Sequence, residues 1–176
     1  MPDDARAKLI DQLQGAYSGE LAAGFAYRGH WHSVRDPQER ERIRQIEADE
    51  WHHRRLVGGL LQQLGAKPRP LREIAFWMIG KFIGGFCHVG GWFFPMYGAG
   101  RLERSNIVEY EDAATYAAAC GHEDMIDCLL TMAEVEWEHE HFFRNKALGH
   151  PLTRLFRIWK APAAKETIRA KRATAA

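Results

Sequence analysis

Two stretches of the chain repeat the same pair of side chains at the same spacing. Glu50 stands three residues before His53, and Glu136 stands three residues before His139. On a helix, residues three apart lie on one face about one turn apart. Carboxylate and imidazole groups in that arrangement are ligands for first-row transition metals, so the repeat indicates metal chemistry.

Both pairs fall within apolar seams that step by three and four residues, as an inward-facing helical stripe requires. Such positions are expected to be buried, and a buried ionised carboxylate is costly unless it is paired or binds a metal. The seams are Ile43, Ile46, Glu50, His53, Val57, Leu60, Leu64 and Met125, Leu129, Met132, Glu136, His139, Phe143.

The same register separates these pairs from similar groups nearby. Glu138 and His141 are also three apart, but they share a face with polar residues and are predicted to face solvent. His52 is rotated by about 100° from the seam. Glu47 also lies off it.

Two further helices each contribute one acid to an apolar seam. Glu20 is the acid in the middle of a helix expected over about 4–33. Glu109 falls on the seam predicted for a helix over about 100–121, where Glu103 and Asp112 are less well placed. Each acid precedes a Glu-x-x-His pair by about one helix and a turn.

Together the six groups provide four carboxylates and two imidazoles, whose charge matches two divalent ions. This is the ligand set of the ferritin-like di-iron and di-manganese bundles. We therefore predict an all-α, ferritin-like four-helix bundle with two iron ions, manganese being the alternative metal. The predicted ligands are Glu20, Glu50, His53, Glu109, Glu136 and His139.

Helix boundaries follow from capping residues. Asp36 and Pro37 are a predicted N-cap and first helical residue, and Gly65, Gly121 and Gly149 are predicted stops. Four helices over about 4–33, 37–64, 100–121 and 122–148 would make one domain over 1–150. A short basic helix and a frayed or disordered tail are expected over 151–176.

The segment 74–99 is apolar and rich in aromatic residues and glycine. We expect short helical pieces interrupted at Pro95. Three interpretations stay open: a membrane span, a buried crossover between helices two and three, or a segment lying in one leaflet of a membrane.

Composition narrows the functional class. The chain has 176 residues and a net charge of +1, which gives no general case for nucleic acid binding. Three scattered cysteines and a polar N-terminus predict a reducing, cytoplasmic location without a signal peptide. If 74–99 lies in one leaflet, the protein would also contact the inner face of the cell membrane peripherally.

The motifs resemble those of the demethoxyubiquinone hydroxylases, a membrane-associated branch of the ferritin-like di-iron proteins. The matching parts are Gly19 to His30, Glu50 to His53, the apolar stretch 72–100, Glu109 with Tyr116, and Glu136 to His139. The resemblance implies hydroxylation of a polyprenylated benzoquinone ring with O2 and reducing equivalents. Tyr110 and Thr115 depart from the usual helix-three pattern of that family.

The leading hypothesis is a di-iron monooxygenase acting on a lipophilic, quinone-like substrate, with an electron donor that the sequence does not identify. Tyr116, two turns beyond Glu109, is predicted to border its cavity, with ordinary core packing as the alternative. Iron oxidation or storage and peroxide reduction are the competing functions. A homodimer is one assembly that the sequence allows.

Overall fold

The computed structural model describes residues 2–173, and these residues are helical without any β-strand. The all-α class predicted from the sequence is confirmed. In chain order the elements are α1 (Pro2–Ser33), α2 (Pro37–Gln63), α3 (Pro70–Phe86), α4 (Phe93–Ala119), η1 (Glu123–Met125), α5 (Ile126–Ala147), η2 (Pro151–Arg154) and α6 (Thr167–Ala173).

The described chain divides into two compact units. Unit 2 is 9–95, and unit 1 joins the first eight residues to the chain from Met96 onward. The segment after α5 belongs to the same unit as α4 and α5. The domain over 1–150 stays a prediction.

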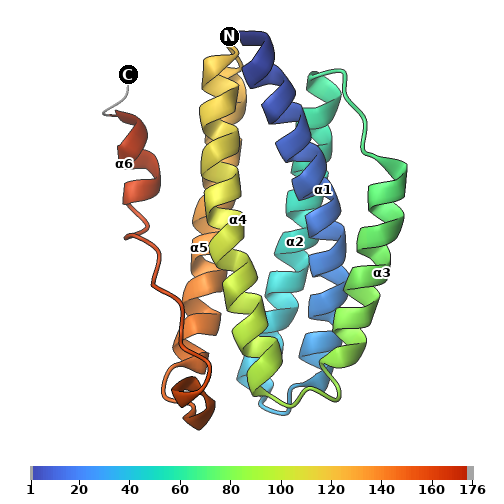
Figure 1. Ribbon diagram of the computed structural model, residues 1–176, viewed down its shortest axis with the longest axis vertical. Coiled ribbons are helices and arrows are strands. Elements are labelled where there is room, and N and C mark those ends of the chain that lie inside the picture. Colours follow the sequence, from blue (N-terminus) through green and yellow to red (C-terminus); the bar gives the residue numbers. More distant parts are fainter. Residues whose placement is uncertain (1, 174–176) are drawn as a thin grey trace. The chain divides into compact units, whose positions relative to one another are not determined.

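Unit 2 contains α1 from Leu9 onward, α2 and α3, which lie side by side in Figure 1. Asp36 caps α2 by accepting hydrogen bonds from the backbone N–H groups of Gln38 and Glu39, and Pro37 opens the helix. Past the end of α2, Gly65 adopts a φ of 64°, a conformation that glycine reaches without steric penalty. The predicted start and stop of this helix are confirmed.

The third helix, α3, packs against α1 through glycine. A Cβ on Gly80 would lie 2.5 Å from the carbonyl oxygen of Ala22, and one on Gly29 would lie 2.2 Å from that of Gly84. The two backbones therefore touch at a distance that only glycine permits. On the same side of α3, Glu73 forms an ion pair with Arg54 of α2 at 2.5 Å.

The opposite side of α3 is apolar and exposed, because Gly80 and Gly84 are the buried residues of this helix. The interpretation of 74–99 as a buried crossover is therefore wrong for α3. None of the helices in residues 2–173 is long and apolar enough to span a bilayer. The exposed side chains are Leu71, Ile74, Trp77, Met78, Ile79, Phe82 and Phe86.

Helix α4, which the sequence predicts over about 100–121, begins earlier than predicted. It starts at Phe93 instead of near residue 100, and Pro95 lies in its first turn. Proline is tolerated there because the first N–H groups of a helix have no partner within it. The expected interruption at Pro95 is wrong for this reason.

Unit 1 is built on α4 and α5, and the chain after α5 folds back along them. Trp137 donates its indole N–H to the carbonyl of Ala163 at 2.8 Å, and Arg169 pairs with Asp127 and Glu134 of α5 at 2.7 Å each. Ile168 is buried. Of the two alternatives predicted for this tail, a helix is present over Thr167–Ala173, and disorder is wrong up to residue 173; the prediction for 174–176 lies outside the described residues.

Candidate metal centre

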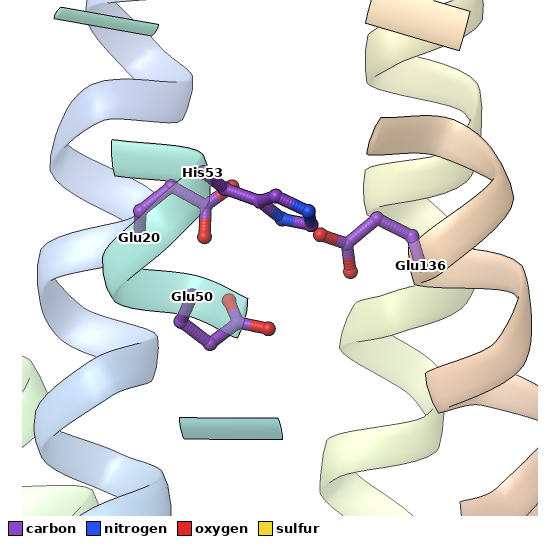
Figure 2. A group of neighbouring side chains, drawn as sticks. All are labelled: Glu20, Glu50, His53 and Glu136. Carbon is purple, nitrogen blue, oxygen red and sulfur yellow. The ribbon is translucent and has the colours of Figure 1, made fainter. Parts of the chain in front are cut away.

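Unit 2 carries one cluster of buried metal-ligating groups, which we call the Glu20 half-site: Glu20, Glu50 and His53. Figure 2 shows Glu20 extending from α1 toward the imidazole of His53 on α2, with Glu50 a turn away. Their ligating atoms all lie within 4.8 Å of one another. His53 Nδ1 lies 3.9 Å from Glu20 Oε1.

The apolar seams of α1 and α2 bury this half-site. Glu20 is 4% exposed, Glu50 0% and His53 2%. Leu13 and Ile46, from the turns on either side, are also fully buried. Two carboxylates held this close in an apolar interior repel one another, so a nearby cation would stabilise them.

Unit 1 carries a second cluster of the same composition, the Glu103 half-site: Glu103, Glu136 and His139. His139 Nδ1 lies 4.0 Å from Glu103 Oε1 and 3.6 Å from Glu136 Oε2. Asn106 donates from its side-chain nitrogen to Glu103 Oε2 at 2.9 Å and to Glu136 Oε2 at 3.4 Å. All three half-site residues are at most 1% exposed.

The acid from α4 differs from the predicted one. Glu103 lies against Glu136 and His139, whereas Glu109 lies on the exposed side of the helix. The residue is exposed as a whole, but its carboxyl is partly shielded from solvent, and this shielding together with the charges of Glu136 and Asp112 raises the pKa of Glu109. The predicted register of α4 is wrong.

The error follows from the start of the helix. The predicted seam began at Leu102, which is 56% exposed. The actual seam begins at Phe93, inside the apolar stretch 74–99, and reaches Glu103 from positions that were predicted to belong to the preceding segment. Its buried residues are Phe93, Met96, Ala99, Glu103, Ile107, Tyr110, Ala113 and Ala117.

Tyr116 does not lie near this cluster along the chain. It follows Glu103 by 13 residues, which is about 20 Å along a helix. Its charge interaction with Lys8 places it toward the N-terminal residues of the chain. Tyr110, in contrast, is 2% exposed and keeps the seven-residue separation from the α4 acid that Tyr116 was expected to have.

Two buried carboxylates adjoin the half-sites without belonging to them. Glu47 accepts hydrogen bonds from the indoles of Trp31 at 2.6 Å and Trp51 at 3.1 Å, and pairs with Arg28 at 2.8 Å. Glu47 lies off the seam, as predicted, but it is nevertheless buried. These partners satisfy its charge, which explains a buried acid outside the metal-ligating set.

Glu140 is the corresponding residue beside the second half-site. It accepts the indole N–H of Trp159 at 2.6 Å, and burial raises its pKa. Trp159 fits against Gly100, where a Cβ would come within 2.5 Å of the indole. Glu140 was not predicted from the sequence, because the glycine and the distant tryptophan give no local signal.

Three of the residues predicted to lie off the seams of α2 and α5 face solvent, as expected. His52, Glu138 and His141 are all exposed. Glu138 pairs with Lys165, and His141 stacks on Trp137 at 4.8 Å between ring centroids. The predicted registers of α2 and α5 are confirmed.

The donor sets of both half-sites fit a metal. Each combines two carboxylates with one imidazole and contains no thiolate, a combination typical of iron and manganese more than of structural zinc. The buried glutamates and histidines of either half-site could therefore bind a metal ion.

Comparison with known proteins points in the same direction. Over 61 residues the chain is 36% identical to the 3-demethoxyubiquinol 3-hydroxylase of Francisella tularensis subsp. novicida. Part of the chain thus resembles a hydroxylase. Proteins of the same name from the subspecies tularensis and holarctica match equally well.

The match is partial in both directions. It covers 35% of this chain and 29% of the length of the relative. No family model matches the chain, and no solved structure matches it significantly. A likeness of this extent supports a role of the hydroxylase type and leaves the metal, the substrate and the partners as proposals.

Proposed function

We propose that the protein is a di-iron monooxygenase that uses O2 to hydroxylate a lipophilic, quinone-like substrate. In this proposal the two half-sites join to form one centre in a ferritin-like four-helix bundle. The six ligands are Glu20, Glu50, His53, Glu103, Glu136 and His139, with Glu103 in the place first assigned to Glu109.

The observation that carries the proposal is the repetition of one buried set in two units. Each unit offers a lone glutamate and a Glu-x-x-His pair from neighbouring helices, which is the ligand pattern of ferritin-like di-metal proteins. Four carboxylates would neutralise two divalent ions. Two separate structural sites would give no reason for this matched composition.

The protein's own groups would hold and shield the centre. Asn106 hydrogen-bonds to both carboxylates of the Glu103 half-site and would fix their orientation. The apolar seams would exclude water from the substrate. Iron bound there would supply the redox chemistry for using O2, with electrons from an external reductant.

The exposed face of α3 supports a lipophilic substrate and contact with a lipid surface. Seven large apolar side chains of one helix are exposed, and no acidic residue occurs between Glu73 and Glu103. Lys81 lies on this helix, with Arg69 and Arg72 near its start. A surface of this kind favours the interface of an anionic membrane, from which an apolar substrate could be drawn.

Metal analysis tests the centre directly. Protein reconstituted with ferrous iron under nitrogen should bind about two ions per chain. Glu136→Ala and His139→Ala should lose metal, whereas Glu138→Ala and His141→Ala, on the exposed face of the same helix, should keep it. Equal metal content in both pairs, or a wild type that binds none, would contradict the centre.

The substrate requires a separate experiment. Lipid extracts of a deletion strain should accumulate a precursor that lacks one hydroxyl group, detected by mass spectrometry. An unchanged lipid profile together with a very large particle on gel filtration would favour iron storage instead.

A further inference from the structure

Unit 2 contains a cavity that the proposed metal centre does not use. Its volume is about 500 Å³, within the range of small-molecule sites. It lies where α1 ends, α2 begins and α3 ends, and these three ends are together in Figure 1. Its lining includes His30, Ser33, Arg35, Cys87, His88 and Trp92.

The cavity is remote from the Glu20 half-site. His30 follows Glu20 by ten residues on α1, which is about 15 Å along the helix. Glu39 precedes Glu50 by eleven residues on α2, a similar distance. The cavity is therefore a separate site at the end of unit 2.

Its polar groups suit a neutral ligand. Arg35 is the one guanidinium in the lining, against the carboxylates of Asp36 and Glu39. Asp36 is engaged by the backbone of α2, and Glu39 accepts the indole N–H of Trp92 at 2.8 Å. Since the lining carries no excess of positive charge, it does not favour an anion.

The two most buried polar groups are neutral as well. Burial lowers the pKa of His30 to about 4 and raises that of the Cys87 thiol to about 11. A neutral imidazole donates at one nitrogen and accepts at the other. In the same lining, the indole of Trp92 provides an aromatic surface. These features match a ring that carries hydroxyl, methoxy or carbonyl groups.

Part of the cavity lining directly follows the apolar face of α3 along the chain. Phe86 immediately precedes the lining residues Cys87 and His88, and it is 42% exposed. Its ring lies against the following turn, since a Cβ on Gly90 would come within 2.6 Å of it. Val89 is 82% exposed in the same turn. An apolar tail leaving the cavity would meet this surface.

We infer that this cavity binds the neutral, oxygen-substituted aromatic head of an amphiphile whose apolar tail lies along Phe86 and the exposed face of α3. The inference rests on the proposed function for its role: the cavity would be a docking site for the substrate class before it reaches the metal centre. Binding itself does not depend on the metal.

Equilibrium dialysis of the full-length protein, under nitrogen to prevent turnover, tests this with four matched probes. These are para-methoxyphenol for the head alone, para-octyloxyphenol for head and tail, octanol for the tail alone, and octyl phosphate for a charged head. We expect para-octyloxyphenol to bind most tightly, by about tenfold or more over the head or the tail alone.

Variants locate the two parts of the site. His88→Leu and Trp92→Leu should weaken both phenols about tenfold, since they remove a hydrogen-bonding group and the aromatic wall. Phe86→Ser should weaken only the tailed phenol. Phe156→Ser, at a side chain of similar exposure in unit 1, should change neither. Iron content and thermal unfolding of each variant check that the fold is kept.

Four results would overturn the inference. They are an absence of phenol binding, equal binding by octanol and para-octyloxyphenol, tighter binding of octyl phosphate, and full binding by both His88→Leu and Trp92→Leu. Each can occur while iron stoichiometry stays at its expected value, so failure of this site is distinguishable from failure of the proposed centre.

Discussion

The carboxylate of Glu103 lies 4.0 Å from the imidazole of His139 and joins α4 to α5 inside unit 1. Both side chains are at most 1% exposed. Glu109, six residues further along α4, lies on its exposed side. These two acids of one helix therefore make a matched pair for testing the metal centre.

We expect Glu103→Ala to lose metal and Glu109→Ala to retain it. Removing Glu103 takes away a buried ligand and leaves Glu136 and His139 to hold an ion with fewer donors. Iron content after anaerobic reconstitution should fall by about half or more in the first variant. If Glu109→Ala loses the same amount, the register of α4 derived from burial does not describe the metal-bound protein.

The sequence predicted three of the four helical seams. On α1, α2 and α5 the acids and histidines lie in the middle of long periodic stretches, so the register has no freedom to slip. On α4 the first turns lie in an aromatic, glycine-rich stretch that contains Pro95. The predicted seam therefore began at Leu102 instead of Phe93. Because Pro95 was interpreted as an interruption of the helix, the predicted metal ligand was Glu109 instead of Glu103.

The remaining differences come from contacts between distant residues. The exposed apolar side of α3 results from glycines that face α1, and an amino acid sequence does not state which face of an apolar helix is covered. The buried acids Glu47 and Glu140 are held by indoles from other segments. Such pairs lack any periodic signal along the chain.

The buried imidazole of His30 should make the free energy of unfolding decrease as the pH is lowered. Its pKa of about 4 in the folded protein lies below the ordinary value of 6.5. The unfolded chain therefore binds a proton in this interval while the folded protein does not. Stability from this group is complete above a pH of about 6.5 and is lost toward about 4, by about 3 kcal/mol in total.

Urea unfolding at several pH values measures this effect. His30→Phe, which keeps an aromatic ring beside Tyr27, should flatten the dependence between those limits. His32→Phe, at an exposed histidine two residues away, should leave it as in the wild type. Parallel curves for wild type and His30→Phe would mean that the pKa of this imidazole is the same in the folded and unfolded protein.

Adding a methyl group to a glycine of α3 should lower the free energy of unfolding at Gly80, which contacts α1, but not at Gly85, which does not. Gly80→Ala introduces a Cβ that would lie 2.5 Å from the carbonyl oxygen of Ala22, so the helices must separate. We expect it to lower the free energy of unfolding by about 1–3 kcal/mol. Gly85→Ala, with no atom within 4 Å of its Cβ, should raise it by about 0.5–1 kcal/mol.

Thermal or urea unfolding of the two variants measures this difference in the free energy of unfolding. Because both substitutions add one methyl group to the same helix, they alter helix propensity equally and differ in the contact with α1. Two variants stabilised to the same extent would show that α3 is not held closely by its glycines.

The exposed face of α3 should bind the protein to anionic vesicles. Ile74 and Phe82 are 56% and 75% exposed and lie on the outer side of the helix. Their removal would take away apolar area without disturbing the glycine contact on the other side. We therefore expect the double variant Ile74→Ser and Phe82→Ser to lose most of its flotation with phosphatidylserine-containing liposomes.

A control in unit 1 makes this result specific. Leu155 is 79% exposed, so Leu155→Ser removes a side chain of comparable exposure away from α3. It should float like the wild type. Raising the salt concentration should weaken binding only in part, since the basic residues near the start of α3 add an electrostatic attraction to the apolar one. If the wild type stays in the soluble fraction at low salt, or if the Ile74 and Phe82 variant floats equally well, then α3 does not contact lipid, and its apolar face must be explained by a protein partner.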